Sequence, residues 1–318
     1  MIRNDERPLP MSDEREPSLQ EVADGVHAWV QPDGSWWVNN AGAIVTADGV
    51  VVVDTCATER RTRAFLTAVN QACADAPITM AVNTHLHGDH TYGNSLLPAS
   101  TVIIGHQSTR AGLLVDPVID GCPPFWDPVP DWGNVTRRPP TLTTLTSLTV
   151  HDGDRRIEIR HPGHAAHTTG DLVVWLPDSG VLFVGDLLFH QVTPLVFMGS
   201  VEGAARALDW IAAFEPDIVV PGHGPLIDAA VLPSVLETHR HYYDLVLDTA
   251  RRGLRDGLSP LAAARSCELD TFAALLDSER IVLNLHRAYA DERGTEMDLI
   301  GALSDAVALN NGPMRTSV

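Results

Sequence analysis

Seven histidine and aspartate side chains are spaced along this chain in a way that could hold metal ions. The densest group lies in the segment His85-Leu86-His87-Gly88-Asp89-His90, and the other three are His167, Asp186 and His223. Imidazole nitrogens and carboxylate oxygens are ordinary zinc ligands, and three imidazoles can hold one divalent ion. An aspartate with two imidazoles can hold a second ion, and one carboxylate can bridge the pair. The pattern therefore predicts a dinuclear metal site of the kind that activates water for hydrolysis.

These side chains follow strands that the hydrophobic pattern predicts. Short apolar runs such as Ile78–Val82, which precedes His85, are typical of strands buried on both faces. Strands are expected at residues 22–30 and 36–45 (joined by a turn at Pro32-Asp33-Gly34), 49–54, 78–82, 102–104, 171–176, 181–184 and 217–220, a hairpin at 150–160, and helices at 58–74, 107–115 and 201–214. Ligands that sit on loops at the ends of separate strands would be held in place by a rigid sheet.

Composition limits the possible partners and locations. The 318-residue chain is 44% hydrophobic, which suits a globular core, and it carries a formal net charge of −19. This acidity disfavours binding to nucleic acid. All 22 basic residues are arginine, so mechanisms that need a Schiff-base lysine or a P-loop lysine are excluded. The four cysteines form no C-x-x-C pair, and no signal-peptide core or membrane-length apolar run occurs. We therefore expect a cytoplasmic protein with a small-molecule substrate, without nucleic-acid or membrane partners, that could form a homodimer.

The chain divides into segments of different character. Residues 1–20 are charged and contain proline, and we expect this tail to be disordered. Residues 21–228 hold all seven candidate ligands and are expected to form the main domain. Residues 229–310 have helical spacing and are expected to form a C-terminal helical subdomain, which is followed by a tail at 311–318. The Pro- and Trp-rich stretch 116–140 is long for a loop, which is typical of a functional segment.

The order and spacing of the motifs resemble the metallo-β-lactamase-fold hydrolase superfamily. The resemblance lies in the H-x-H-x-D-H segment at 85–90, His167-Thr168-Thr169-Gly170-Asp171, Phe183-Val184-Gly185-Asp186 and Val220-Pro221-Gly222-His223-Gly224. Val53-Asp54-Thr55 is similar to the segment that carries the family's structural aspartate. The match covers roughly residues 22–228. It implies an α/β (α+β) fold, a four-layer αβ/βα sandwich of two mixed β-sheets flanked by helices, here with a C-terminal helical extension.

The resemblance also implies how the ligands divide between two zinc ions, although manganese or iron could replace zinc. The first ion would be held by His85, His87 and His167, the second by Asp89, His90 and His223, with Asp186 as the bridge. A water between the ions would lose a proton near neutral pH, and the resulting hydroxide would attack an acyl carbon. Asp89 and Asp186 are therefore expected to be catalytic, and Asp89 could orient the nucleophile. His164 remains an alternative to His167 as a ligand of the first ion.

Further side chains are candidates for substrate contact. They are Trp36, Trp37, Tyr92, Phe125, Trp126 and His190. Trp36 and Trp37 lie near a hairpin that often overhangs the site in this family, and Tyr92 could donate a hydrogen bond to an oxyanion. The aromatic residues of the long loop, Trp132 among them, could form an apolar lid. Ordinary packing is the alternative for each of these side chains.

The resemblance favours hydrolysis of an ester, lactone, thioester or amide bond in a small acyl substrate. Weak β-lactam hydrolysis is an alternative, although the family's dedicated β-lactamases have a cysteine or no bridging carboxylate at the position of Asp186. Glutathione thioesterases of the family keep all seven ligands, but their basic residues for glutathione cannot be matched here. An oxidoreductase similar to the mononuclear iron sulfur dioxygenases is the alternative from another class, and the complete second ligand set argues against it.

Overall fold

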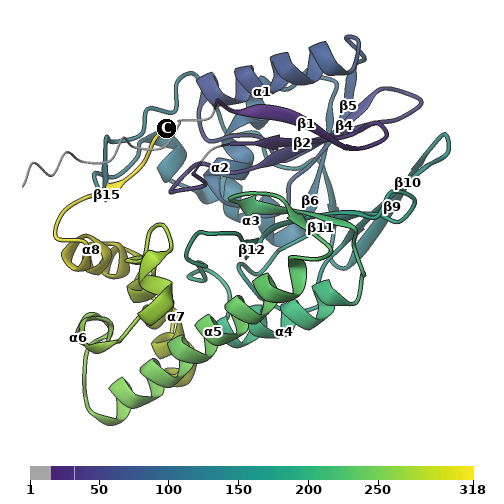
Figure 1. Ribbon diagram of the computed structural model, residues 1–318. Coiled ribbons are helices and arrows are strands. Elements are labelled where there is room, and N and C mark those ends of the chain that lie inside the picture. Colours follow the sequence, from purple (N-terminus) through teal and green to yellow (C-terminus); the bar gives the residue numbers. More distant parts are fainter. Residues whose placement is uncertain (1–15, 32) are drawn as a thin grey trace, which may run out of the picture.

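The computed structural model describes residues 16–31 and 33–318, so residues 1–15 of the predicted tail and Pro32 of the predicted turn lie outside the described residues. Within this part of the chain, two large mixed β-sheets pack face to face, and helices cover their outer faces (Figure 1). The predicted αβ/βα sandwich is therefore confirmed.

The first sheet has the strand order β1-β2-β3-β4-β5-β6-β8. Its strands are β1 (Ser18–Ala23), β2 (Val26–Val30), β3 (Ala41–Val45), β4 (Val50–Val53), β5 (Ile78–Val82), β6 (Val102–His106) and β8 (Leu142–Thr144). Strands β1 to β4 are antiparallel neighbours, whereas β4, β5, β6 and β8 run parallel. All of β4 is buried, as its unbroken run of valines predicts for a strand covered on both faces.

The second sheet has the strand order β14-β13-β12-β11-β10-β9. Its strands are β9 (Ser147–Asp152), β10 (Arg155–Arg160), β11 (Val173–Leu176), β12 (Val181–Phe189), β13 (Ile218–His223) and β14 (Ile227–Asp228). Strands β9 and β10 form the predicted hairpin. Strand β12 extends to Phe189 instead of ending at residue 184, so Asp186 lies within a strand. Because β12 and β13 are parallel, Asp186 and His223 approach the same edge of this sheet.

Helices α1 (Glu59–Ala72) and α4 (Val201–Ala212) lie on opposite outer faces of the sandwich (Figure 1). The Thr58 hydroxyl caps α1 by accepting a hydrogen bond from a backbone N–H of its first turn, and Ser200 caps α4 in the same way. Phe65 and Val69, four residues apart on α1, are buried against the first sheet. These local signals explain why both helices were predictable from the sequence.

The C-terminal region is helical, as its spacing predicts. It contains α5 (Leu232–Arg255), α6 (Pro260–Ser266), α7 (Arg280–Arg293) and α8 (Leu299–Leu309). These helices share one apolar core with α4 and the outer face of the second sheet. Their status as a separate subdomain stays a prediction. Among the described residues, no helix combines the length and the apolar character that crossing a bilayer requires.

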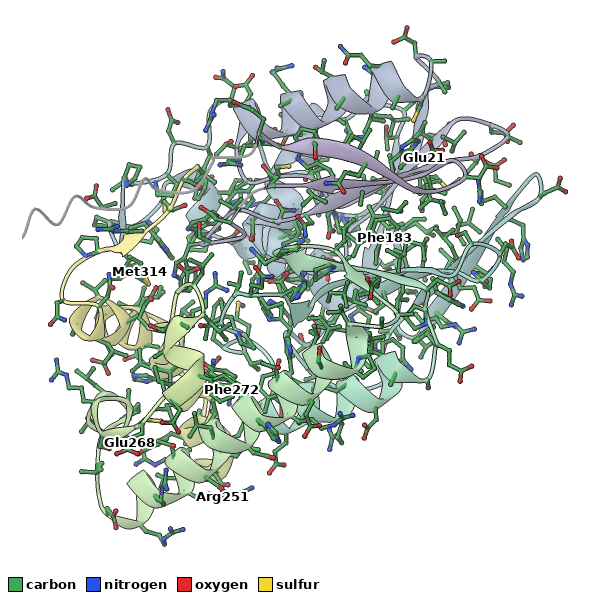
Figure 2. The ribbon with its side chains drawn as sticks, viewed as in Figure 1. Glu21, Phe183, Arg251, Glu268, Phe272 and Met314 are labelled. Carbon is green, nitrogen blue, oxygen red and sulfur yellow. The ribbon has the colours of Figure 1, made fainter. Side chains whose placement is uncertain are left out.

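The space between the sheets is filled by alternate side chains of both. Val51 and Val53 of β4 face Val174 of β11 and Phe183 of β12 in this core, and all are buried. Phe183, labelled in Figure 2, shares this core with Val51 and Val53 of the first sheet. A Cβ at Gly42 of β3 would overlap the Phe183 ring, so glycine makes room for the aromatic side chain. This packing fixes the two sheets relative to each other beneath the predicted ligands.

The predicted strand at 36–45 is wrong in its first half. Only Ala41–Val45 forms a strand, and residues 36–40 form a loop. Trp37 adopts the left-handed conformation with φ of 68°, and the Val38 N–H bonds to the Ser35 carbonyl in a turn. The pattern misled because aromatic and β-branched residues favour strands only where a neighbouring strand can pair with them.

Both predicted tail boundaries need correction. Residues 18–20 belong to β1, because β2 gives them an antiparallel partner. In the predicted tail 311–318, β15 (Met314–Arg315) pairs in parallel with β7 (Trp126–Asp127) of the long loop. Met314, labelled in Figure 2, is fully buried. These partners lie far away in the sequence, so local composition could not reveal the pairing.

Candidate metal centre

The structure brings all seven predicted ligands together in two adjacent groups. The first group is His85, His87, His167 and Asp186, and the second is Asp89, His90 and His223. Within each group, the atoms that could bind a metal lie within 4.8 Å of one another. His87 is half-buried, and the other six side chains are buried. This division matches the one that the family resemblance implies.

Both sheets contribute to this centre. From the first sheet, His85 follows β5, and the short helix α2 (Gly88–Thr91) carries Asp89 and His90. From the second sheet, His167 lies in the loop between β10 and β11, while Asp186 lies in β12 and His223 ends β13. The centre therefore depends on the packing of one sheet against the other.

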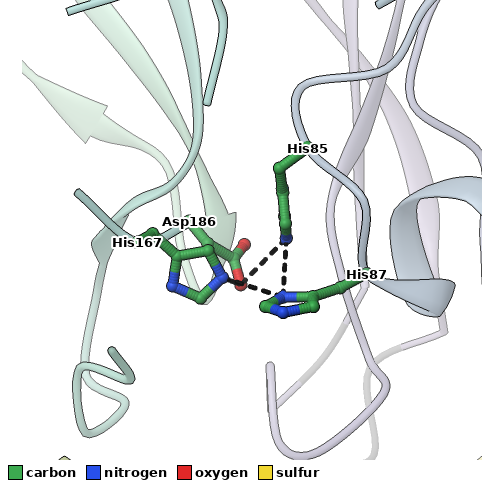
Figure 3. Close-up of side chains that lie close together, drawn as sticks. All are labelled: His85, His87, His167 and Asp186. Atoms are coloured by element: carbon green, nitrogen blue, oxygen red, sulfur yellow. Dashed lines mark hydrogen bonds and ion pairs between the residues drawn. The ribbon is translucent and has the colours of Figure 1, made fainter. Parts of the chain in front are cut away.

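Three imidazoles and one carboxylate converge in the first group, which Figure 3 shows. His87 Nδ1 lies 3.0 Å from His85 Nε2 and 2.9 Å from His167 Nε2. Asp186 Oδ2 lies 3.3 Å from His167 Nε2 and 3.8 Å from His85 Nε2. The facing nitrogens surround a position that a single cation could share.

Asp186 also reaches the second group. Its Oδ1 lies 3.1 Å from His90 Nε2, and its Oδ2 lies 3.4 Å from His223 Nε2. Asp89 Oδ2 lies 3.2 Å from His223 Nε2 and 3.7 Å from His90 Nε2. One carboxylate thus contacts imidazoles of both groups, which is the position that a bridging ligand needs.

Hydrogen bonds on the far side of the rings determine which nitrogen faces the centre. His167 Nδ1 donates to the Leu195 carbonyl at 2.6 Å, and His223 Nδ1 donates to the Gly34 carbonyl at 2.9 Å. A carbonyl oxygen only accepts, so each Nδ1 carries the hydrogen and each neutral ring turns the lone pair of Nε2 inward. His90 Nδ1 lies 2.8 Å from Asp54 Oδ2, which has the same effect. Such outer partners are typical of histidines that bind metals.

Asp54 supports a second ligand through Thr84. The Thr84 hydroxyl donates to Asp54 Oδ2 at 2.7 Å, so its oxygen can accept the hydrogen of His85 Nδ1 at 3.0 Å. Asp54 Oδ1 accepts the Thr84 backbone N–H at 2.7 Å. The segment similar to the family's structural aspartate thus holds both His85 and His90. His87 is oriented differently, since its ring stacks on Phe197 with the centroids 5.0 Å apart.

The electrostatics differ between the two groups. Burial lowers the pKa of His87 to about 3, helped by the neighbouring His167, and burial also lowers the pKa values of His85 and His167. Burial disfavours a charged His223 as well, but the Asp186 and Asp89 carboxylates outweigh it and raise that pKa to about 9. The first group therefore offers neutral imidazole lone pairs at neutral pH, whereas a metal must displace a proton from His223 in the second.

The polar atoms of the centre fit a divalent cation. His90 Nε2 and Asp186 Oδ1 are buried, and neither makes a well-directed hydrogen bond to any described residue. Burial would raise the pKa of the Asp186 carboxyl, but the surrounding imidazoles, led by His223 and His90, hold it well below its usual range. Lone pairs that point at one another are stabilised when a cation lies between them. Nitrogen and carboxylate donors without thiolate suit zinc and also manganese or iron.

Glycine next to a ligand allows this close approach. A Cβ at Gly222 would overlap the Asp186 carboxylate, so the backbone before His223 can pass beside the bridging position only without a side chain. The motif Pro221-Gly222-His223 therefore needs its glycine for space.

The predicted substrate contacts receive different placements. Tyr92 is buried and donates its hydroxyl hydrogen to Asp116 Oδ2 at 2.7 Å, which corresponds to the packing alternative for this side chain. Trp36 is buried, and its Nε1 donates to Glu279 at 2.7 Å, which is a packing role. Trp37 is half-buried, packs edge-on against Trp126 and Trp132, and stacks on Tyr92.

The remaining candidates lie outside both groups. Phe125 is half-buried and packs against Trp126, which is itself buried. His190 is half-buried, and its Nδ1 lies 3.1 Å from the Pro225 carbonyl. His164, the alternative to His167, lies outside both groups, with its Nε2 3.0 Å from the Gly203 carbonyl. Trp37 therefore combines partial exposure with a contact to Tyr92, the residue that follows α2.

Comparisons with known proteins agree with this fold and centre. The model of the Metallo-beta-lactamase superfamily matches residues 34–223, which include all seven ligands. A linear primary-alkylsulfatase from Pseudomonas sp. (strain ATCC 19151) is 26% identical over 68% of this chain and 47% of its own. A type 2 metallo-beta-lactamase from Bacillus sp. (strain 170) is 24% identical over 63% of this chain and 72% of its own.

A solved structure extends the likeness to the C-terminal helices. The stereoselective inverting sec-alkylsulfatase Pisa1 from Pseudomonas sp. superposes with a TM-score of 0.68 and 17% identity, over 90% of this chain and 51% of its own. The present chain thus spans about half the length of the alkylsulfatases that it matches. The family match includes more than half of the chain and every predicted ligand, so this protein belongs to the metallo-beta-lactamase superfamily.

Proposed function

We propose that this protein is a dinuclear zinc hydrolase that cleaves an ester, lactone, thioester or amide bond of a small substrate. The observation that carries the proposal is the position of Asp186, whose carboxylate lies within 3.4 Å of imidazoles from both groups. When bound, the metals supply the acidity that makes water nucleophilic near neutral pH and that polarises the bond under attack.

The chain's own residues supply position and proton transfer. Asp89 Oδ2 lies 3.2 Å from His223 Nε2, so this carboxylate can accept a proton or hold the hydrogen of a water beside the second group. Burial of both carboxylates strengthens such interactions, because little water screens them. Outer hydrogen bonds keep four of the imidazoles in place and the Phe197 ring supports that of His87, so little reorganisation is needed when a substrate binds.

Sulfate esters are a second candidate substrate class. The match to the linear primary-alkylsulfatase covers 68% of the present chain. The fold likeness to Pisa1 includes the C-terminal helices. Since the Pisa1 likeness is one of fold, it supports testing alkyl sulfates beside acyl substrates and no more. A β-lactam is a further candidate substrate, because a type 2 metallo-beta-lactamase is among the relatives by sequence.

The proposal is tested by metal content and a substrate panel on the same preparation. Elemental mass spectrometry on protein purified without added metal should find about two zinc ions, or zinc with manganese, per chain. The zinc-loaded protein should then hydrolyse at least one of a nitrophenyl ester, a lactone, a thioester, an alkyl sulfate and a β-lactam. About one iron per chain would move the protein to the oxidoreductase class. No hydrolysis of any of these substrates by fully loaded protein would overturn the proposal.

A further inference from the structure

Helix α7 lies outside the sequence motifs, yet its first turns face the segment that supports His167. The ring of His167 is oriented by the Leu195 carbonyl, which accepts its Nδ1 hydrogen at 2.6 Å. Residues 193–196 form neither helix nor strand. Their carbonyls are therefore not directed by a regular backbone ladder, and something else must hold Leu195.

The side chain of Asn284 fixes the backbone on both sides of Leu195. Its Nδ2 donates to the Pro194 carbonyl at 2.8 Å, and its Oδ1 accepts the Val196 N–H at 2.6 Å. These two hydrogen bonds fix the backbone groups of the residues directly before and after Leu195. Asn284 has 1% of its surface exposed, and its remaining Nδ2 hydrogen goes to the Tyr242 hydroxyl at 2.9 Å.

Further hydrogen bonds from residues before Asn284 hold the same backbone segment. The Thr193 N–H donates to the Leu276 carbonyl at 3.0 Å, and Arg280 donates to the Thr193 carbonyl at 3.1 Å. Arg280 is buried, and Asp277 neutralises it at 2.7 Å. The segment 276–284 therefore binds the segment 193–196 at several successive backbone groups.

We propose that Asn284 is a positioning residue for the metal centre, which sets the Leu195 carbonyl and through it the His167 imidazole. The inference rests on the proposed metal centre and goes beyond it, since it assigns a role to a residue 61 positions past the last ligand motif at His223. An asparagine suits this role, because one planar amide offers a donor and an acceptor to flanking backbone groups at once.

The position has a specific consequence for the two metal groups. His167 belongs to the first group, whereas the second group takes its outer support from Asp54 and from the Gly34 carbonyl. Loss of the Asn284 bonds should therefore weaken the first group alone. Loss of an outer partner of a metal-binding histidine typically lowers metal affinity by about 10- to 100-fold.

The test measures each group separately. His223→Ala removes a ligand of the second group and leaves the first, while His167→Ala leaves the second. Metal-stripped proteins are titrated with Co²⁺, and the absorption of the bound ion gives the affinity. In the His223→Ala background, Asn284→Leu should lower Co²⁺ affinity about 10- to 100-fold. In the His167→Ala background, the same change should leave Co²⁺ affinity unaltered.

Matched variants separate positioning from packing. Tyr242→Phe removes the third bond of the Asn284 amide but keeps both bonds around Leu195. It should lower the thermal midpoint without changing Co²⁺ affinity. If Asn284→Leu does not fold, Asn284→Asp makes the comparison, because it keeps the shape and the acceptor for Val196 while losing the donor for Pro194.

Several results would overturn the inference. Equal Co²⁺ affinity with and without Asn284→Leu in the His223→Ala background would show that His167 does not depend on Asn284. An equal loss in both backgrounds, or an equal loss with Tyr242→Phe, would show that Asn284 contributes only to general packing. Absence of Co²⁺ binding by the unmodified protein would overturn the metal centre itself, and it would be seen before any variant is compared.

Discussion

At the scale of single residues, Asp186 is the side chain that contacts imidazoles of both candidate metal groups. Its two oxygens face imidazoles of both groups, and Gly222 leaves the space for it. Asp186→Asn should reduce hydrolysis by more than about 100-fold, the upper end of the loss caused by residues that merely support a ligand. Steady-state kinetics of the zinc-loaded variant measures this loss. Asp209→Asn, which alters an exposed carboxylate paired with Arg240, should keep full activity. Full activity of metal-loaded Asp186→Asn would contradict the bridging role.

The grouping of the seven candidate ligands was predictable from the sequence, but the groups that orient their side chains were not. Histidine and aspartate in fixed spacing carry a chemical signal that can be read from residue types. The carbonyls of Gly34 and Leu195 carry none, because every residue has a carbonyl and only the fold decides its direction. Tyr92 shows the same limit, because its position near a motif does not reveal that its hydroxyl bonds to Asp116, a residue of another segment.

His239 should make stability depend on pH. Both ring nitrogens are used, because Nδ1 donates to the Val235 carbonyl and Nε2 accepts the Phe189 N–H. Burial lowers the pKa of His239 from 6.5 to about 4. Between these values the unfolded chain binds a proton that the folded chain does not, so the free energy of unfolding falls as pH falls through this window. The loss should approach about 3 kcal/mol.

The pH effect is isolated by comparing variants of metal-stripped protein. Denaturant titrations between pH 4 and 7 should give a flatter profile for His239→Gln than for the unmodified chain, since glutamine can accept the Phe189 N–H without taking up a proton. His241→Gln, at an exposed neighbouring position, should keep the original slope. Identical slopes for all three proteins would show that His239 is not the source of the pH dependence.

At the scale of elements, prediction succeeded where a segment's own pattern decides its structure. Helix α1 has a capping residue and an amphipathic repeat, and β4 is an unbroken apolar run. The sequence predicted neither strand β15 nor the loop at 36–40, and the reason is the same for both. Thr316 bridges to Trp36, and Met314 pairs with Trp126, so each depends on a partner far away in the sequence.

Thr316 should stabilise the join between the C-terminal strand and the Trp36 loop. Its hydroxyl donates to the Trp36 carbonyl at 2.6 Å, and the side chain is buried. Thr316→Val keeps the shape but leaves that carbonyl without this donor, so the free energy of unfolding should fall by about 1 kcal/mol. Chemical denaturation followed by tryptophan fluorescence measures the change. Thr238→Val, at an exposed helix position with a comparable hydroxyl bond, should cost less than about 0.5 kcal/mol. Equal costs would mean that β15 is not anchored through Thr316.

At the scale of the whole molecule, the metal centre joins the two halves of the sandwich. His85, His87, Asp89 and His90 come from the first sheet, and His167, Asp186 and His223 come from the second. Two sheets of this kind can pack through their apolar faces alone, as the core around Phe183 does. Bound metal would add links between them at one edge, where the ligands otherwise face one another as lone pairs and carboxylates.

Metal removal should therefore destabilise the sandwich as one unit. A ligand that binds only the folded state stabilises it by an amount that grows with concentration, about 4 kcal/mol at a thousand times the dissociation constant. Calorimetry on metal-stripped protein should show a single transition whose midpoint rises steadily as zinc is added. Asp186→Asn should flatten this rise, because the bridge between the groups is weakened, while Asp209→Asn should follow the unmodified protein. A midpoint that does not respond to zinc, or a response confined to a minor early transition, would mean that the metals leave the packing of the two sheets unchanged.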